Sequence, residues 1–184
     1  MNFLDQFRYT FDNLSELSIT KNQDTETKTS YNNPQLKSLL STSVKVTPEI
    51  FPKVAEAIDQ VFERLKLKNN FNFFITANHL QTQALCAMMP QSSNAEIIIT
   101  SKMIDLLNGE ELQSVIGHEV SHFYYQHSLY PSPNQARTKT EFLNLLHLSR
   151  AAEISADRVG FLGSGSLEYS LRSMLKITSG LGDQ

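Results

Sequence analysis

The sequence predicts an α+β fold in which several helices pack on one side of a small, mainly antiparallel sheet. Three short strand-like runs lie at 71–76, 83–89 and 95–100, separated by polar or proline-containing turns, and the first and third are aromatic or β-branched. Segments with apolar side chains every three or four residues precede and follow these runs, as is typical of helices. A chain of 184 residues can bury a core without disulfides.

An amphipathic helix and a polar connector are expected at 1–33, ahead of a main domain at 34–184. Apolar side chains recur every three or four residues within 3–19: Phe3, Phe7, Phe11, Leu14 and Leu17. Residues 21–33 are rich in Thr, Asn, Lys, Asp and Glu, which is typical of a flexible connector. The sequence leaves open whether the helix docks on the main body or on a partner.

The helix before the strands is expected to begin with Thr47 as its N-cap, because Pro48 suits the first helical position and Glu49 the first turn. One face of it is apolar: Val54, Ile58, Val61, Phe62 and Leu65. After the strands we expect a short helix at 101–107. Asn108, three residues before Glu111, then resembles the start of a capping box.

The helix that begins at Asn108 is expected to run to about His127, where two prolines within 128–140 forbid its continuation. A long helix at about 140–162 follows. Glycines and a serine at 163–165 separate it from a last amphipathic helix, whose apolar residues are Leu167, Leu171, Met174 and Leu175.

The sequence GHEVSH at 117–122 places the pattern H-E-x-x-H inside a predicted helix. His118 and His122 lie one turn apart on the same face, so both imidazoles can reach one metal ion at about 2 Å. Glu119 projects from the neighbouring side and can deprotonate a water molecule without being a ligand. Two histidines and a carboxylate are costly to bury without a purpose. We therefore predict a zinc site and regard an accidental match in a purely structural helical domain as the weaker hypothesis.

A catalytic zinc ion usually has three protein ligands, and the next helix offers the third. Glu153 and Asp157 lie at i and i+4, on one face of that helix. Small residues near this face allow a close approach to the first helix: Ser149, Ala152, Ala156 and Gly160. The alternative interpretation is an exposed Glu153, with Asp157 paired to Arg150 or Arg158. Beside an H-E-x-x-H helix, we expect Glu153 to be the third ligand.

These two motifs, GHEVSH and the later EISADR, resemble the gluzincin metallopeptidases of the CAAX-prenyl-protease and HtpX-like family. The family pattern is H-E-x-x-H followed by E-x-x-x-D on a later helix. The resemblance implies one zinc ion held by His118, His122 and Glu153. It also implies that Glu119 is the general base and that Asp157 accepts a hydrogen bond from a ligand histidine, expected to be His118.

The resemblance covers roughly 71–162 and also implies a substrate-binding edge strand, here formed by Ala84, Leu85, Cys86 and Ala87. The asparagine that the family usually carries in this strand is absent. The resemblance implies a zinc endopeptidase that hydrolyses a peptide or unfolded-protein substrate. The alternative is a metal-binding but latent or inactive interaction module.

Two further departures from the family concern its membrane helices and its oxyanion-stabilising residue. Many relatives carry transmembrane helices and a downstream His or Arg that stabilises the oxyanion, and this chain shows no evident equivalent of either. Tyr124, Tyr125 and Arg150 are the candidate substitutes, and the sequence does not choose among them.

The other histidines, His79, His127 and His147, are expected to be structural or exposed to solvent. On a continuing helix, a residue five positions after His122 is poorly placed to join the pair.

Composition excludes some partners. A net charge of −3 without a basic run gives no electrostatic footprint for nucleic acid. The single cysteine, Cys86, excludes an intrachain disulfide and is expected to be an inert, buried thiol. Without a signal-peptide layout or an apolar stretch of roughly 20 residues, we expect a cytoplasmic protein; peripheral membrane association and the oligomeric state stay open.

Overall fold

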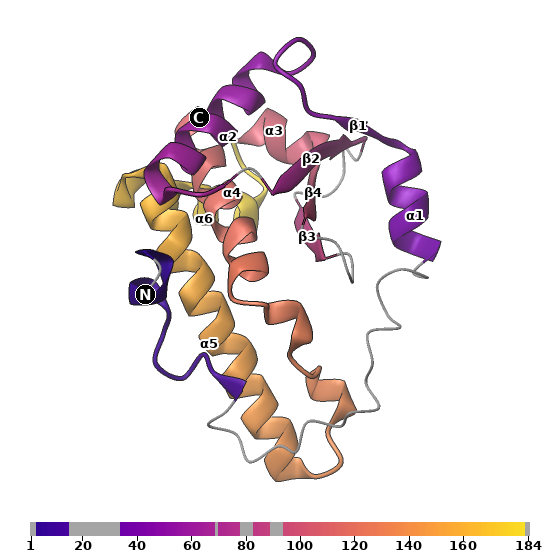
Figure 1. Ribbon diagram of the computed structural model, residues 1–184, viewed down its shortest axis with the longest axis vertical. Helices are drawn as coiled ribbons and strands as arrows, with labels where there is room; N and C mark the ends of the chain where they lie inside the picture. The colour runs from indigo at the N-terminus through magenta and orange to yellow at the C-terminus, as the bar shows by residue number, and fades with distance from the viewer. Residues whose placement is uncertain (1–2, 15–33, 69, 78–82, 89–93, 183–184) are drawn as a thin grey trace.

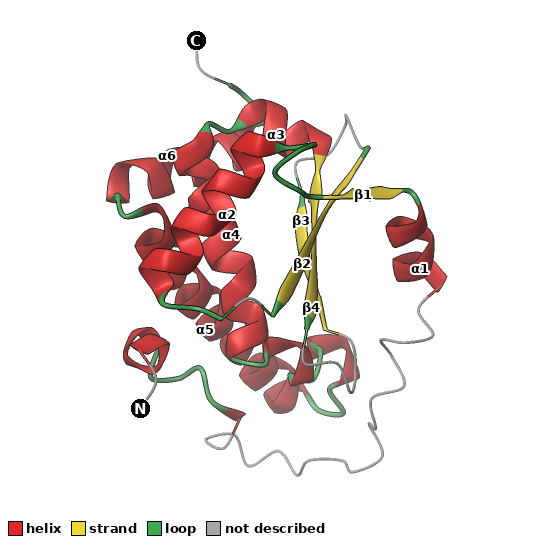
Figure 2. Ribbon diagram, turned by 45° about the horizontal axis from the view of Figure 1, so that its top comes forward, coloured by secondary structure: helices red, strands yellow, loops and turns green. Residues whose placement is uncertain are grey.

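A computed structural model describes five stretches of the chain: 3–14, 34–68, 70–77, 83–88 and 94–182. In this part the architecture is α+β, as the sequence predicts. Figure 2 shows a small sheet with α2, α4 and α6 on one side of it and α1 beyond β1 on the other. The prediction for His79 lies outside the described residues.

The elements of the described part follow one another along the chain in a helix–sheet–helix order. They are η1 (Phe3–Phe7), α1 (Pro34–Ser41), β1 (Ser43–Lys45), α2 (Pro52–Leu65), β2 (Phe71–Thr76), β3 (Ala84–Met88), β4 (Ala95–Thr100), α3 (Ser101–Leu106), α4 (Gly109–Tyr124), η3 (His127–Leu129), η4 (Pro133–Gln135), α5 (Lys139–Ser164) and α6 (Leu167–Ser179). The three predicted strands and the four helices predicted after residue 100 are present, with shifts of a few residues at their ends.

The sheet of the described residues is mixed: two of its three strand pairings are antiparallel, as the prediction of a mainly antiparallel sheet requires, and one is parallel. Its strand order is β1-β2-β4-β3. β2 and β4 are parallel, whereas β1 pairs with β2 and β3 pairs with β4 in antiparallel fashion. The isoleucine-rich β4 is buried along most of its length and therefore occupies the interior of the sheet, which separates the consecutive strands β2 and β3. As a result β3 lies at an edge.

The hydrophobic core lies between the sheet and helices α2 and α4. Isoleucines of β4, including Ile97 and Ile99, pack with Val61 of α2 and Ile116 of α4, and all four are fully buried. α2 begins at Pro52 and not at Thr47 as predicted, because residues 47–50 form a turn closed by a 2.9 Å bond from the Phe51 N–H to the Thr47 carbonyl.

Helices α4 and α5 pack side by side through glycines, and Figure 1 shows them as neighbours. A Cβ atom added to Gly117 of α4 would lie 2.8 Å from the carbonyl oxygen of Val159, and one added to Gly160 of α5 would lie 2.7 Å from that of Ser114. These contacts leave no room for a side chain at either position. The predicted close approach of the two helices is thus achieved by glycine on both sides.

Helix α6 turns its polar residues inward. Lys176 is buried and donates to Glu111 of α4 over 2.8 Å, so a fully buried carboxylate has a charged partner. The predicted amphipathic pattern is present, but the leucines Leu167, Leu171 and Leu175 are 60%, 49% and 70% exposed. The buried face of α6 is therefore the polar one, and its Lys176 neutralises Glu111.

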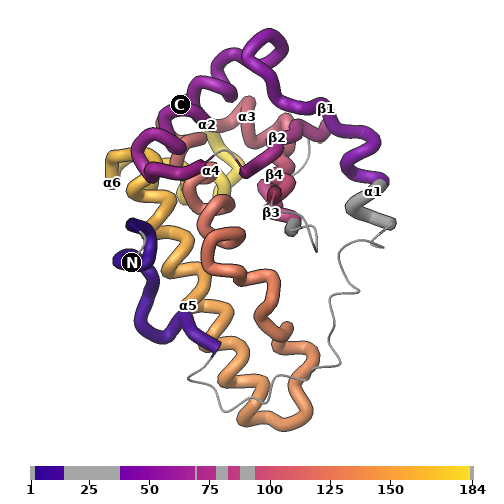
Figure 3. Tube along the Cα trace, in the orientation of Figure 1, coloured from indigo at the N-terminus to yellow at the C-terminus, as the bar shows by residue number. Residues whose placement is uncertain are grey.

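The N-terminal segment, residues 3–14, docks on the main body alongside α5 (Figure 3). Leu4 is buried, and its carbonyl accepts a 2.7 Å bond from the hydroxyl of Tyr125. The Tyr9 N–H donates to Ser155 Oγ over 2.9 Å. Of the helix predicted at 3–19, the structure shows a 3-10 helix over Phe3–Phe7 and turns or irregular backbone at 8–13; 15–19 and the connector lie outside the described residues.

None of the helices in the described part of the chain combines the length and the apolar character needed to cross a bilayer.

Candidate metal centre

The H-E-x-x-H motif lies in the C-terminal half of α4, whose start is a complete capping box. Asn108 Oδ1 accepts from the Glu111 N–H over 2.8 Å, and Glu111 Oε2 accepts from the Asn108 N–H over 2.9 Å. This reciprocal pair satisfies backbone donors at the helix start. Together with the buried Lys176–Glu111 pair, it anchors the helix that presents the histidines.

Three potential metal-binding atoms converge between α4 and α5. His118 Nε2 lies 3.0 Å from His122 Nε2 and 3.4 Å from Glu153 Oε2. Donor atoms of the three residues all lie within 4.8 Å of one another. Atoms bound to one tetrahedral zinc at roughly 2.0–2.1 Å are separated by roughly 3.3 Å, so this set of two imidazoles and one carboxylate fits such an ion.

Asp157 lies behind His118, on the side away from these atoms. Its Oδ1 is 3.0 Å from His118 Nδ1. The carboxylate therefore faces the histidine, whereas the alternative interpretation paired it with an arginine. A carboxylate at the outer nitrogen favours the Nδ1–H tautomer and leaves Nε2 free to bind a cation.

His127 contacts His122, contrary to the prediction that it lies away from the pair. Its Nδ1 is 2.8 Å from His122 Nδ1. α4 ends at Tyr124, and Gln126 adopts a left-handed conformation with φ 59° and ψ 39°, which turns the chain back before His127. The prediction assumed a helix continuing to this residue, on which it would point elsewhere.

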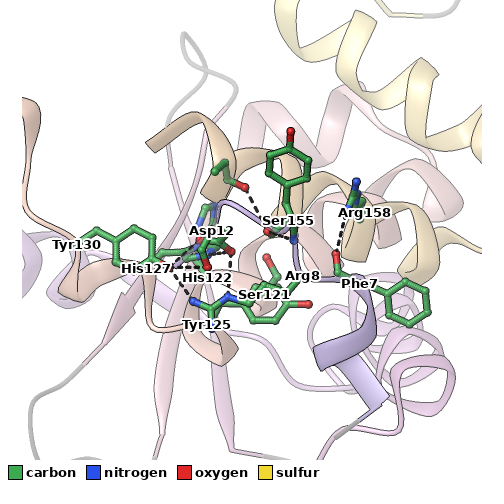
Figure 4. Close-up of polar contacts among 12 residues, drawn as sticks. Phe7, Arg8, Asp12, Ser121, His122, Tyr125, His127, Tyr130, Ser155 and Arg158 are labelled. Atoms are coloured by element: carbon green, nitrogen blue, oxygen red, sulfur yellow. Dashed lines mark hydrogen bonds and ion pairs between the residues drawn. The ribbon is translucent and has the colours of Figure 1, made fainter. Parts of the chain in front are cut away.

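The N-terminal segment supplies Asp12, which the sequence did not single out. Figure 4 shows Asp12, His127 and His122 close together, with Arg8 and Tyr130 beside the Asp12 carboxylate. Asp12 Oδ2 lies 3.0 Å from His127 Nε2 and 3.3 Å from Arg8 Nε, and Oδ1 accepts a 2.6 Å bond from Tyr130. An aspartate in a segment predicted to be an amphipathic helix carries no sequence signal for this role.

The electrostatics of the converging residues are those of groups arranged around one positive charge. Burial opposes protonation of His118, but hydrogen bonds to Asp157 and Glu153 outweigh it and raise its pKa to about 10. Burial and the charge of His118 lower the pKa of His122 to about 4. The hydrogen bond from His118 likewise lowers the pKa of Glu153. Without a metal ion, the proton on His118 thus lies among the three residues, where a metal cation can replace it.

Glu119 lies in a different environment from Glu153. Burial is the main reason that its pKa is raised, and the charge of Glu153 acts in the same direction. The backbone of Cys86 in β3 contributes a hydrogen bond that opposes this rise. The thiol of Cys86 is itself desolvated, which raises its pKa to about 12 and keeps it protonated at neutral pH.

A cavity of about 470 Å³ joins these groups to the edge strand. It is lined by the candidate ligands His118, His122 and Glu153, by Glu119 and by three residues of β3, Ala84, Leu85 and Cys86, but not by Ala87. The candidate oxyanion residues lie elsewhere. Tyr124 donates to Asp5, Tyr125 donates to Leu4, and Arg150 lines a second cavity together with His147.

A helix carrying H-E-x-x-H, faced by a carboxylate from the following long helix beside an edge strand, defines the class of metallopeptidases. Comparison with protein families agrees: residues 48–143 match the profile of peptidase family M48. The chain therefore belongs to peptidase family M48, whose members are zinc-dependent metallopeptidases. No curated protein and no solved structure matches it significantly. The match ends before Glu153, which is placed in the site by the fold alone.

Proposed function

We propose that this chain is a zinc-dependent endopeptidase that hydrolyses peptides or unfolded proteins. The observation that carries the proposal is the convergence of His118, His122 and Glu153 in a cavity that also contains Glu119 and the edge of the sheet. Membership of the family supports the same chemistry. We infer one zinc ion per chain, held by these two histidines and Glu153.

A zinc ion in this position supplies a Lewis acid that acidifies water and polarises the scissile carbonyl. Glu119 is then the group that accepts the proton of the attacking water and delivers it to the leaving amine. Its raised pKa suits both tasks, because a base with a pKa nearer to neutrality also returns the proton readily. Asp157 holds His118 in the tautomer that presents Nε2 to the cavity.

The edge strand β3 supports binding of an extended substrate by strand addition. The Thr100 N–H donates to the Gln83 carbonyl over 2.9 Å, so the backbone of Gln83 faces β4. Because backbone groups alternate along an antiparallel strand, those of Ala84 and Cys86 face the open edge. We therefore propose that the backbone of Ala84 and the carbonyl of Cys86 contact the substrate backbone, whereas the Cys86 N–H faces Glu119. Leu85 and Ala87 then mainly hold the strand in the sheet.

The decisive experiment compares wild type with Glu119→Gln, which keeps the shape of the side chain but removes the base. We expect zinc stoichiometry to be unchanged and cleavage of an unfolded protein to fall by roughly 10²–10⁴-fold. Glu110→Gln is the matched control, because Glu110 lies exposed in the first turn of the same helix. Full activity in Glu119→Gln would contradict the assignment of the base.

A metal-binding but inactive or latent module is the second candidate function. The observation that favours it is the lining of the cavity, which among the described residues contains no lysine or arginine to stabilise an oxyanion. The hydroxyl of Tyr130, which also lines the cavity, is engaged by Asp12. A wild-type protein that holds zinc but cleaves no unfolded substrate would support this alternative.

A further inference from the structure

The contact between His122 and His127 restricts where the protons of both rings lie. His122 Nε2 faces the converging donor atoms, so this nitrogen needs a free electron pair if it is to bind a cation. The proton of the neutral ring is then on Nδ1 and is donated to His127 Nδ1 over 2.8 Å. His127 must accept at that nitrogen, so its own proton is on Nε2.

Asp12 is the acceptor that selects this arrangement. His127 Nε2 lies 3.0 Å from Asp12 Oδ2, and a carboxylate only accepts hydrogen bonds. The opposite tautomer of His127 would bring two N–H groups face to face at one end and leave Asp12 without a proton from the ring at the other. Every donor in the three groups meets an acceptor only if His122 donates to His127 and His127 donates to Asp12.

The Asp12 carboxylate is itself held firmly, as a positioning group must be. Its side chain is fully buried, and Arg8 and Tyr130 bind it in addition to His127. Arg8 also donates to the Tyr130 hydroxyl over 2.7 Å, which closes the cluster. Several donors thus fix the two oxygens and leave the carboxylate little freedom to turn away from His127.

We propose that Asp12 is a positioning residue of the metal centre, which acts through His127 to orient His122 for zinc binding. The N-terminal segment at 3–14 is then part of the centre. The two ligand histidines each have a carboxylate behind them, Asp157 directly and Asp12 through a second imidazole. This inference rests on the proposed function, since it assumes that His122 is a zinc ligand.

The segment has an anchoring hydrogen bond that does not involve the histidines, so orientation and docking can be tested separately. The hydroxyl of Tyr125 holds the Leu4 carbonyl, and Tyr125 does not line the metal-containing cavity. Tyr125→Phe removes this anchor and keeps the ring. Asp12→Ala removes the acceptor of His127 instead.

The test measures zinc affinity by competition with a chromophoric chelator in wild type, Asp12→Ala, His127→Ala, their double variant and Tyr125→Phe. We expect Asp12→Ala and His127→Ala each to weaken binding by roughly 10–100-fold. The double variant should be no weaker than the poorer single variant, because both break one path. Asp12→Asn keeps an acceptor for His127 and should recover most of the affinity. Tyr125→Phe should leave it unchanged.

A second readout is the visible absorption of the Co²⁺-loaded proteins, which reports ligand geometry. It should change in Asp12→Ala and not in Tyr125→Phe. If Asp12→Ala does not fold by circular dichroism, the same cycle is built with Asp12→Leu, which also removes the acceptor of His127 but fills the buried space. Additive losses of Asp12→Leu and His127→Ala would overturn the proposal.

The outcomes separate this proposal from the proposed function. If wild type binds zinc and Glu153→Ala does not, the three-ligand site is established. A zinc affinity in Asp12→Ala equal to that of wild type then overturns the positioning role alone. A loss in Tyr125→Phe as large as that in Asp12→Ala also overturns it, because the effect is then one of docking. A folded wild type that binds no zinc overturns the proposed function and this inference with it.

Discussion

At the scale of single residues, the ionisation of Asp12 shows how a buried charge is kept. Burial alone would raise the pKa of this carboxyl, but hydrogen bonds from His127, Tyr130 and Ser155 outweigh it and lower the pKa from 3.8 to about 2. The bonds favour the charged form, so the folded state binds the proton more weakly than the unfolded chain does. Asp12 therefore stabilises the fold in its ionised form.

This gives a prediction for stability against pH in the absence of metal. The contribution of Asp12 should be fully present above about pH 4 and lost as the pH falls towards 2, and the shift corresponds to about 2 kcal/mol. Asp12→Asn should be less stable than wild type at pH 7, and the difference should close between pH 4 and pH 2. Urea unfolding of both proteins with chelator across this range measures it. A difference that does not depend on pH would show that the charge is not responsible.

At the scale of elements, the distance between α4 and α5 controls the site, because the histidines lie on one helix and Glu153 and Asp157 on the other. The glycines at 117 and 160 allow the helix backbones to come within contact distance. A Cβ atom at Gly160 would also lie 3.5 Å from Cβ of His118. The packing of the two helices and the geometry of the proposed metal site are therefore coupled at this crossing.

Gly160→Ala is expected to push the helices apart. The added methyl group meets a backbone carbonyl at 2.7 Å, which a side-chain rearrangement cannot relieve. We expect a loss of about 1–3 kcal/mol in the free energy of unfolding, together with weaker zinc binding as Glu153 moves away from His118. Gly109→Ala is the control, because its Cβ atom meets nothing within 4 Å. Chemical denaturation and zinc titration of both variants test this, and an unchanged affinity in Gly160→Ala would argue against the coupling.

The same scale shows what the sequence could predict. Local signals sufficed for α4, since the capping box and the apolar period lie within the helix itself. The strand order and the one parallel pairing, of β2 with β4, were not predicted, because they depend on long-range packing and not on local pattern.

The contribution of His127 was missed because it depends on where one helix ends. A left-handed Gln126 cannot be read from residue type, since this conformation is uncommon for residues other than glycine. Asp12 was missed because its partners lie more than a hundred positions away. The motif residues, in contrast, meet through the regular geometry of two helices.

At the scale of the whole molecule, the proposed metal centre joins parts of the chain that are distant in sequence. The three proposed ligands come from α4 and α5, and the cluster behind them includes residues 8 and 12. An ion bound by these helices is bound by the folded state only, because the unfolded chain does not hold the three ligands together. Metal binding should therefore stabilise the entire fold.

Unfolding by urea in chelator and in buffered zinc tests this linkage. With free zinc at 100 times the dissociation constant, wild type should gain about 2.7 kcal/mol in the free energy of unfolding. Glu153→Ala should gain much less at the same zinc concentration, since one of its three ligands is missing. Glu168→Ala is the matched control, because this glutamate lies exposed on α6, away from the cavity, and its variant should gain as much as wild type. An equal gain in Glu153→Ala would mean that zinc stabilises the protein from another site, and the three-ligand assignment would then be wrong.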